Sequence, residues 1–262
     1  MKNLKVLISV AVIAAILGSL LCCFAASEEK YAYVNISDGK SVVAAMEKVP
    51  YADKDNDGKW TVNDVLIAVH ESKCKDGYAT VTSDYGPMIT KLWGVENGGS
   101  YGYYLNNAMA MSLTDEIKSG DVLYAYVYAD AAGYSDAYSF FDKASFENEG
   151  GNKVTLKLSY VSGFDESYAP VISALEGATV IVDGKKAEVK TAADGSAEIT
   201  LPKKTAVITA EKEGLTLVPP VCVSFVASSG SSLLWLWIIL AVVIVAPVCF
   251  CVIKAAGRKK AE

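Results

Sequence analysis

The chain has 262 residues, and 52% of them are hydrophobic, more than most soluble globular proteins contain. The excess lies in two terminal stretches, whereas residues 27–230 carry 18 basic and 29 acidic residues, a formal charge of −11. This charge argues against nucleic acid as a partner, because surfaces that bind nucleic acid are basic, and it suits calcium or cationic partners.

The first terminal stretch, residues 1–25, predicts a secretory signal peptide. Basic residues precede an apolar run over residues 6–21, and the small residue Ala25 ends the segment. A lipoprotein signal through Cys22 or Cys23 is the weaker alternative, because lipoprotein signals usually place Gly, Ala or Ser before the modified cysteine. We therefore expect the chain to be exported.

Residues 53–64 match the pattern of a calcium loop, in which oxygen ligands come from positions 1, 3, 5, 7, 9 and 12 and a glycine at position 6 allows a sharp turn. The expected ligands are Asp53, Asp55, Asp57, the backbone carbonyl of Lys59, Thr61 directly or through water, and Asp64. Gly58 occupies the turn position. Asp64 replaces the usual Glu, a feature that resembles the calcium loops of dockerin repeats. The alternative is a solvated acidic turn that caps the next helix.

A short helix is predicted after this loop, over residues 62 to about 72, with Thr61 as its N-cap. Its apolar face is formed by Val62, Val65, Leu66 and Val69. The chain's single histidine, His70, also lies on this helix, and we expect a helix-end side chain there rather than a metal ligand.

Strands are predicted around the helix wherever apolar and polar residues alternate. They cover residues 31–36, 77–82, 88–93, 101–106 and 122–128. Residues 41–48 fit a short helix and a strand equally well.

Four segments of this half carry a family resemblance. They are Thr61-Val62-Asn63-Asp64-Val65-Leu66, Leu92-Trp93-Gly94-Val95, Tyr103-Tyr104-Leu105-Asn106-Asn107 and Gly120-Asp121 before an aromatic strand. In this order they resemble the transcobalamin C-terminal-like domain, a small β-grasp-like module, over roughly residues 30–145. The resemblance implies a non-catalytic module that contacts a ligand, and it suggests a corrinoid as one candidate.

Tyrosines are concentrated in the same half. Of 15 in the chain, eight fall within residues 101–138. An exposed aromatic platform could stack on a flat ligand, and the expected ligand-binding residues are Trp93, Tyr101, Tyr103 and Tyr104. The alternative is that alternating tyrosines fill the core and place their hydroxyl groups at its rim.

The second half predicts a β-sandwich, because short strands recur at regular intervals. They cover residues 154–160, 178–182, 187–191, 197–201 and 206–210. Residues 182–185 and 193–196 each contain Asp-Gly and predict hairpin turns. The segment around residues 191–199 resembles bacterial immunoglobulin-like or prealbumin-like repeat domains, which implies spacing and display rather than chemistry.

The second terminal stretch, residues 233–253, is 21 almost purely apolar residues and predicts a transmembrane helix. Trp235 and Trp237 suit an aromatic belt, and the basic residues after 253 suit a cytoplasmic tail. We therefore expect a single-pass protein of the cell membrane with its ectodomain outside the cell.

The cysteines, the single histidine and the glycine-containing loops give no evidence of a catalytic site. Cys74 and Cys222 either form one bridge between domains or remain two buried free thiols. A lone histidine without a nucleophile motif argues against a His-based catalytic triad, and no phosphate-binding loop is present, so we expect no enzyme activity.

Two functions remain. The first is a membrane-anchored, calcium-binding extracellular module that captures a small ligand or a surface partner. The second is a structural or adhesive stalk with no small-molecule ligand. The predicted organisation is a signal peptide (1–25), a calcium-loop and β-grasp-like domain (26–148), an immunoglobulin-like β-sandwich (149–228), a stalk (229–232), a transmembrane helix (233–253) and a cytoplasmic tail (254–262).

Overall fold

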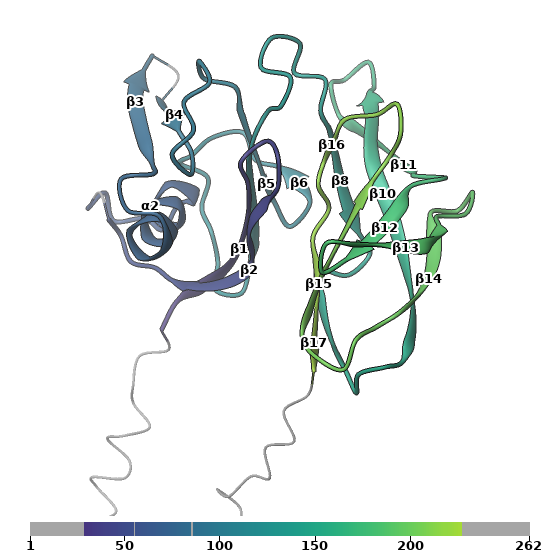
Figure 1. The fold of residues 1–262 in the computed structure, drawn as a ribbon. Coiled ribbons are helices and arrows are strands. Elements are labelled where there is room, and N and C mark those ends of the chain that lie inside the picture. Colours follow the sequence, from purple (N-terminus) through teal and green to yellow (C-terminus); the bar gives the residue numbers. More distant parts are fainter. Residues whose placement is uncertain (1–28, 55, 85, 227–262) are drawn as a thin grey trace, which may run out of the picture. The chain divides into compact units, whose positions relative to one another are not determined.

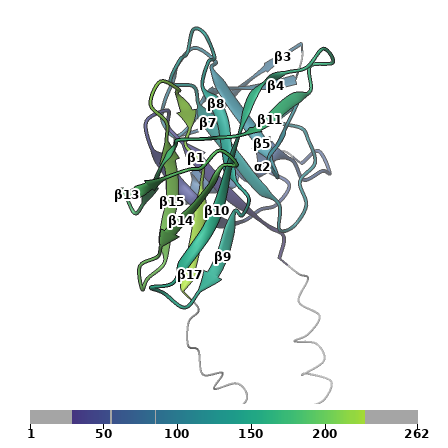
Figure 2. The ribbon, with the colours of Figure 1, turned by 90° about the vertical axis from the view of Figure 1, so that its right-hand side faces the viewer.

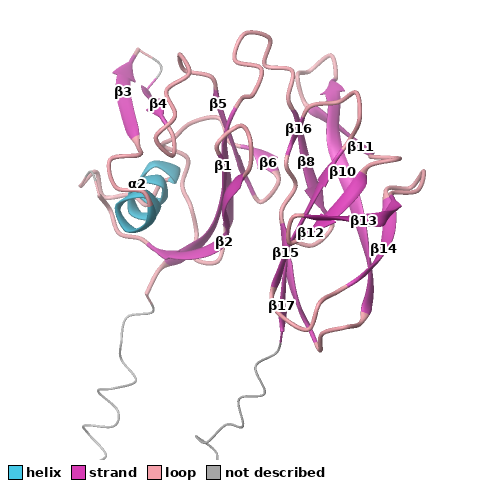
Figure 3. Ribbon diagram, viewed as in Figure 1, coloured by secondary structure: helices cyan, strands magenta, loops and turns pink. Residues whose placement is uncertain are grey.

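The computed structural model describes residues 29–54, 56–84 and 86–226, which are mainly strand with one described helix (Figures 1 and 3). The elements of the first half are β1 (Tyr31–Ser37), β2 (Val42–Pro50), α2 (Val62–Lys73), β3 (Ala79–Ser83), β4 (Gly86–Lys91), β5 (Tyr101–Leu105), β6 (Ala108–Met109) and β7 (Val122–Val127). Those of the second half are β8 (Ala137–Phe141), β9 (Ser145–Asn148), β10 (Lys153–Phe164), β11 (Pro170–Ala174), β12 (Thr179–Val182), β13 (Lys185–Lys190), β14 (Ser196–Thr200), β15 (Ala206–Glu211), β16 (Leu217–Val218) and β17 (Cys222–Val226). The prediction of a mainly β chain with a short helix is confirmed.

The expected signal peptide, stalk, transmembrane helix and cytoplasmic tail lie outside the described residues. Asp55, one of the expected calcium ligands, also lies outside them. Within the described part, no helix has the length and apolar character needed to cross a bilayer.

The first half forms a lobe, here called the helix lobe, around one five-stranded sheet with the strand order β2-β1-β7-β5-β6. The neighbours β1 and β7 run parallel, whereas the other pairs are antiparallel. A parallel pair needs a long crossover connection, and α2 lies within it. The helix covers one face of the sheet, and β3 and β4 form a separate hairpin (Figures 1 and 3).

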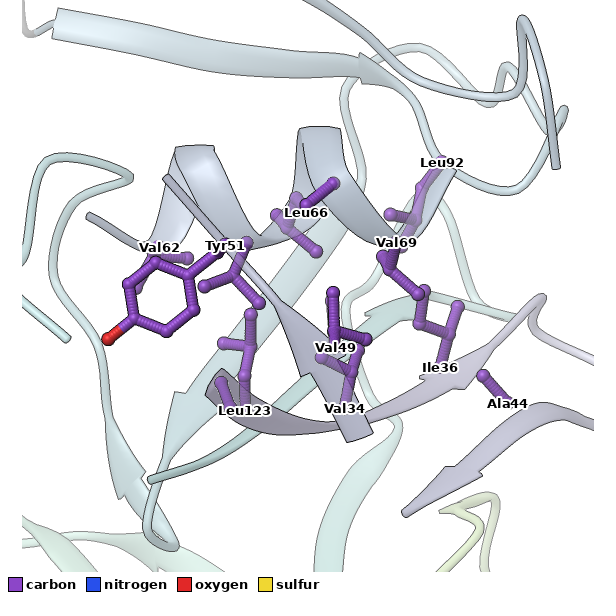
Figure 4. Close-up of a cluster of buried hydrophobic side chains, with 14 of the residues drawn as sticks. Val34, Ile36, Ala44, Val49, Tyr51, Val62, Leu66, Val69, Leu92 and Leu123 are labelled. Atoms are coloured by element: carbon purple, nitrogen blue, oxygen red, sulfur yellow. The ribbon is translucent and has the colours of Figure 1, made fainter. Parts of the chain in front are cut away.

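Strand alternation and the helical repeat together build the core of the helix lobe. Val34 and Ile36 of β1 and Leu123 of β7 face Leu66 and Val69 of α2, and all five side chains are fully buried (Figure 4). Burying one such side chain contributes about 1.5–3 kcal/mol. The helix is therefore held by its apolar face, as the spacing of those residues predicts.

The start of α2 is fixed by a reciprocal cap, and the prediction of Thr61 as N-cap is confirmed. The Thr61 hydroxyl accepts the backbone N–H of Asp64, while the Asp64 carboxylate accepts the backbone N–H of Thr61 at 2.9 Å. Each bond satisfies a backbone donor that the first helical turn leaves without a partner.

Of residues 41–48, which fit helix and strand equally, all but Ser41 belong to β2. The strand pairs with β1 but bulges at Met46, whose φ is +48°. The Asn35 side chain accepts the Met46 backbone N–H at 2.7 Å across this irregularity. Pairing with β1 therefore decides a segment whose local pattern is ambiguous.

The second half forms a lobe of two sheets, here called the two-sheet lobe (Figure 2). One sheet has the order β11-β10-β8-β16, with β14 also paired to β10, and the other has the order β13-β12-β15-β17-β9. Both sheets contribute to one buried cluster, for example through Phe141, Leu158, Val180 and Ile208. Because β8 pairs with β10, strands of this lobe begin before residue 148, the expected boundary.

The two predicted hairpin turns have different outcomes. Residues 182–185 join the paired strands β12 and β13, and that prediction is confirmed. Residues 193–196 are not a hairpin, because β13 lies in one sheet while β14 pairs with β10 in the other. Gly195 has φ of +77°, and a Cβ there would lie 2.3 Å from the Leu158 carbonyl oxygen. The glycine therefore allows the turn to pack directly on β10.

Candidate functional site

The first half of the predicted calcium loop forms a tight turn. The Asp53 carboxylate accepts the backbone N–H groups of Asp57 at 3.2 Å and of Gly58 at 2.9 Å. Gly58 has φ of +83°, which glycine adopts without steric cost, and open space lies where its Cβ would be. A calcium loop requires such a turn at its sixth position.

The second half of the loop is tied to a segment about fifty residues further along the chain. The backbone N–H of Ile117 donates to the Trp60 carbonyl at 2.9 Å, and that of Val62 donates to the Asp115 carbonyl at 3.0 Å. Thr61 and Glu116 form an antiparallel bridge between these two bonds. The exit of the loop is therefore fixed by the fold of the lobe.

Asp64, the expected closing ligand, is fully buried at the helix start. Its Oδ1 accepts the Lys54 backbone N–H at 2.6 Å, and its Oδ2 accepts the backbone N–H and the hydroxyl of Thr61, both at 2.9 Å. These donors occupy most of the acceptor positions of the carboxylate. In this arrangement Asp64 joins the entrance of the loop to the cap of α2.

The expected metal ligands therefore fall into two groups. Asp53, Asp57 and Lys59 lie in the turn at the surface, whereas Thr61 and Asp64 are buried at the cap. Over residues 29–54, 56–84 and 86–226, no three His, Cys, Asp or Glu side chains are grouped so that they could hold a metal ion. The capping bonds of Asp64 compete with any ligation by its carboxylate, and calcium binding by the loop remains a prediction from the sequence.

His70 is a buried structural side chain, 3% exposed. Its Nδ1 lies 2.6 Å from the Leu66 carbonyl, and its Nε2 accepts the Trp93 backbone N–H at 3.1 Å. One nitrogen must donate and the other accept, so the ring is neutral. Burial lowers the pKa of His70 from its ordinary value of 6.5, although the bond to Leu66 opposes this shift.

The four aromatic residues expected to bind a ligand do not share one surface. Trp93, Tyr101 and Tyr103 are half-buried and pack against the core beneath α2, whereas Tyr104 is buried on the opposite face of the sheet. Successive residues of a strand point to opposite faces, so β5 separates Tyr103 from Tyr104.

On the face away from α2, tyrosines join the helix lobe to the two-sheet lobe. The rings of Tyr104 and Tyr138 are stacked with centroids 3.5 Å apart and planes 3° from parallel. The Tyr138 hydroxyl donates to the Asn107 side chain at 2.9 Å, and the Tyr124 hydroxyl donates to the Pro219 carbonyl. Burial raises the pKa of Tyr104 to about 12. This interlobe tyrosine cluster is therefore a neutral, closely packed contact.

Beside this cluster lies an aromatic cleft of about 250 Å³. Its floor is formed by the buried rings of Tyr104, Tyr126 and Tyr138. Its walls are formed by Tyr128, Tyr134, Tyr160 and Phe164. Tyr134 and Phe164 are 56% and 52% exposed, so aromatic faces from both lobes are open to solvent at its rim.

The loop that carries Tyr134 is held by hydrogen bonds from two carboxylates to backbone N–H groups. The Asp136 carboxylate, 8% exposed, accepts the backbone N–H groups of Ala129 at 2.6 Å and Asp130 at 2.9 Å. The Asp130 carboxylate in turn accepts the Gly133 backbone N–H at 2.8 Å, and a Cβ on Gly133 would lie 2.5 Å from that carboxylate. Tyr134 itself has φ of +53°. A left-handed backbone is uncommon for an aromatic residue, and here it holds an exposed ring at the cleft.

A larger groove of about 920 Å³ runs between β2 and the strands β12 and β15. Several of the charged residues that line it form ion pairs. Lys186 pairs with Glu211, and Glu47 pairs with Lys73 at 2.8 Å. The groove contains no aromatic side chain among the described residues that line it. The aromatic cleft is the better candidate for a ligand site.

Both described cysteines are free. Cys222 is buried in the core of the two-sheet lobe, where burial raises its pKa to about 12. Cys74 is half-buried at the end of α2. The alternative of two free thiols therefore describes the structure better than a bridge.

Sequence reasoning missed three contributors to the cleft. Tyr160 and Phe164 come from β10, which was expected to belong to a separate domain, and Asp136 precedes a strand that was not predicted. Tyr134 was counted among the clustered tyrosines, but its exposure was not foreseen. Its Asp130-x-x-Gly133 turn was the available signal, because Asp and Gly favour turns that admit positive φ.

Comparison with known proteins identifies no relative. No protein-family model, no curated protein and no solved structure matches the chain. The resemblance to transcobalamin C-terminal-like domains remains a prediction from the sequence.

Proposed function

We propose that this chain is an exported, membrane-anchored, non-catalytic binding module that captures a small ligand in its aromatic cleft. The observation that carries the proposal is the open pair of rings at the rim, Tyr134 from one lobe and Phe164 from the other. Both rings line the same cleft, and an exposed apolar site of this kind often marks a binding surface.

The fold of the helix lobe supports a β-grasp-like module. Its sheet order β2-β1-β7-β5-β6, with a parallel pair β1 and β7 and one helix across a face, is compatible with such a module. The two sheets of the second lobe are compatible with an immunoglobulin-like sandwich. Both folds are common as display and binding modules and require no catalytic residues.

The volume of the cleft bears on the size of the ligand. A cavity of about 250 Å³ lies below the usual range for drug-sized ligands. A corrinoid is a macrocycle with bulky side arms and is much larger. The cleft suits a compact ligand, such as one sugar ring or one small head group.

We also propose that calcium binds the loop of residues 53–64. Asp53, Asp55, Asp57 and the Lys59 carbonyl would hold the ion, and Thr61 and Asp64 would complete the set if the capping bonds rearranged. Bound calcium would neutralise the clustered carboxylates and stiffen the entrance to α2. The turn at Gly58 supports this assignment.

The stalk protein is the second candidate. It predicts that the aromatic rings are buried, and Tyr104, Tyr124, Tyr126 and Tyr138 are each no more than 4% exposed. This interlobe tyrosine cluster would stiffen a spacer. The open rings of Tyr134 and Phe164 favour ligand capture instead.

The two candidates are separated by a binding screen of the full chain. Ligand-observed NMR should detect at least one compound from a panel of sugars, amines, haem and corrinoids. Binding should weaken in the Phe164→Ala variant, whose exposed side chain contributes little to stability. If no compound binds, or if binding is indifferent to Phe164, the stalk is the better description.

A further inference from the structure

We infer that the aromatic cleft recognises a small quaternary ammonium compound, with the methylated nitrogen against the rings of Tyr134 and its neighbours. This inference rests on the proposed function, because it names the class of ligand that the same cleft would take. It follows from three properties of the cleft: its ring geometry, its charge and its hydrogen bonds.

The ring geometry provides a corner of aromatic faces. Tyr128 and Tyr134 lie 5.3 Å apart between centroids with planes at 82°, and Tyr126 and Tyr128 lie 5.0 Å apart at 64°. A group placed in such a corner meets more than one ring. Aromatic faces attract cations through the ring quadrupole, and quaternary ammonium ions are characteristic ligands of such sites.

The charge of the cleft favours a cation. Asp136 is the one charged residue among the described residues that line it, and no described lysine or arginine does so. Elsewhere the protein places its own lysines over aromatic rings, Lys30 over Trp60 and Lys48 over Tyr31. The cleft combines electron-rich rings with a buried carboxylate. Because no described lysine or arginine lines it, a ligand can supply the cation.

The hydrogen bonds favour a methylated ammonium over a primary amine. The two oxygens of Asp136 each accept a backbone N–H. The hydroxyl of Ser135 donates to Asp130 at 2.7 Å, that of Tyr126 to Tyr128 at 3.1 Å, and that of Ser162 lies 3.1 Å from the Val171 carbonyl.

The carboxylate and the two serine hydroxyls of the cleft therefore already have hydrogen-bond partners in the protein. A primary ammonium would lose hydrogen bonds to water and regain few from these groups, and buried polar groups without partners are unfavourable. A quaternary ammonium has no N–H to satisfy. Its charge can be met by aromatic faces and a nearby carboxylate alone.

The test is a titration of the full chain with choline and with its neutral isostere 3,3-dimethyl-1-butanol. The protein is kept in a polyoxyethylene detergent, which carries neither an ammonium group nor a sugar. The two probes have the same shape, so any difference in affinity reports the charge. We expect choline to bind at least about tenfold more tightly, the ratio that corresponds to ~1.4 kcal/mol.

Matched variants locate the site. Tyr134→Asn removes the ring but keeps a residue type that tolerates positive φ, and we expect it to weaken choline binding about tenfold. Tyr134→Phe keeps the ring and should bind as the wild type does. Tyr168→Asn is the control, because Tyr168 is also exposed (86%) and has φ of +62° but does not line the cleft.

Each other outcome has a distinct meaning. Equal binding of choline and its isostere, or no binding of choline, would overturn the inference. If N-acetylglucosamine binds instead and Tyr134→Asn weakens it, the cleft is a ligand site and the proposed function stands without the cation. If Tyr134→Asn and Tyr168→Asn have equal effects on every probe, the cleft is not the site and the proposed function fails as well.

Discussion

The Trp93 backbone N–H donates to Nε2 of His70 at 3.1 Å, and this bond joins the last turn of α2 to the segment just after the β3–β4 hairpin. Trp93 has φ of +50°, so the bond also stabilises an uncommon backbone conformation. The His70 ring is stacked on Tyr78 with centroids 5.0 Å apart. A single neutral imidazole therefore holds three segments of the helix lobe together.

This arrangement predicts that the protein loses stability as pH falls below about 6.5. The folded-state pKa of His70 is lowered while the unfolded value is near 6.5, so the unfolded chain takes up the proton first. The contribution is fully present above pH 6.5 and is lost as pH falls toward the folded-state pKa, by at most about 1.4 kcal/mol per pH unit. Chemical denaturation from pH 7.5 to 5 measures it. His70→Gln should show a shallower pH dependence, and identical slopes would contradict the prediction.

The calcium loop makes a second prediction, about thermal stability. If calcium binds only the folded protein, a concentration tenfold above its dissociation constant stabilises by about 1.4 kcal/mol. Asp57→Ala should abolish this increment. Because Asp57 also accepts the Lys59 backbone N–H at 2.8 Å, the quantity to compare is the change in melting temperature on adding calcium, not the melting temperature itself.

Two controls complete that experiment. Asp84→Ala removes an acid from the β3–β4 turn, away from the loop, and should keep the full calcium response. Magnesium should stabilise much less, because it demands a stricter octahedral geometry. A calcium response that survives Asp57→Ala would mean that the loop is a solvated acidic turn.

The interlobe tyrosine cluster predicts that both lobes unfold together. Tyr138→Ala removes a buried ring that stacks on Tyr104, and such truncations cost about 3–5 kcal/mol. We expect one transition for the wild type, followed both by far-ultraviolet and by tyrosine near-ultraviolet circular dichroism, and a lower midpoint for the variant. Tyr168→Ala is the exposed control. Two separate transitions in the wild type would show that the lobes are independent.

Gly195 provides a prediction about the two-sheet lobe. A Cβ at this position would lie 2.3 Å from the Leu158 carbonyl oxygen, and φ is +77°. Gly195→Ala should therefore destabilise the protein by roughly 1–3 kcal/mol, through strain and displaced pairing. Gly184→Ala tests φ alone, because Gly184 has φ of +74° with open space around it. If the two variants lost equal stability, the close approach of Gly195 to β10 would not contribute to the loss.

Local features of the chain could be predicted well from the sequence. The helix was predicted from the spacing of its apolar residues and from Thr61 as its cap, and it ends one residue later than expected, at Lys73. Most of the alternating segments are strands. These signals depend on neighbours within a few residues, which the sequence shows directly.

Features that depend on distant partners could not be predicted. The sequence does not show which face of β5 and β7 packs against a second lobe. Tyr104 was therefore grouped with Tyr103, although the two side chains point to opposite faces of the sheet. The cleft needs Phe164 from β10, and no local pattern links that residue to Tyr134. The turn at residues 193–196 was misjudged for the same reason, because Asp-Gly allows a tight turn but does not determine which strand pairs next.

The strand β7 has buried side chains on both faces. Leu123 and Ala125 face α2, whereas Tyr124 and Tyr126 face the two-sheet lobe, and β1 and β5 flank it within the sheet. Water can reach its backbone only after both cores have separated from it, and amide exchange then requires nearly global opening. The amide hydrogens of β7 should thus be among the last in the protein to exchange with deuterium. Their exchange rate would report the stability of the whole two-lobe unit.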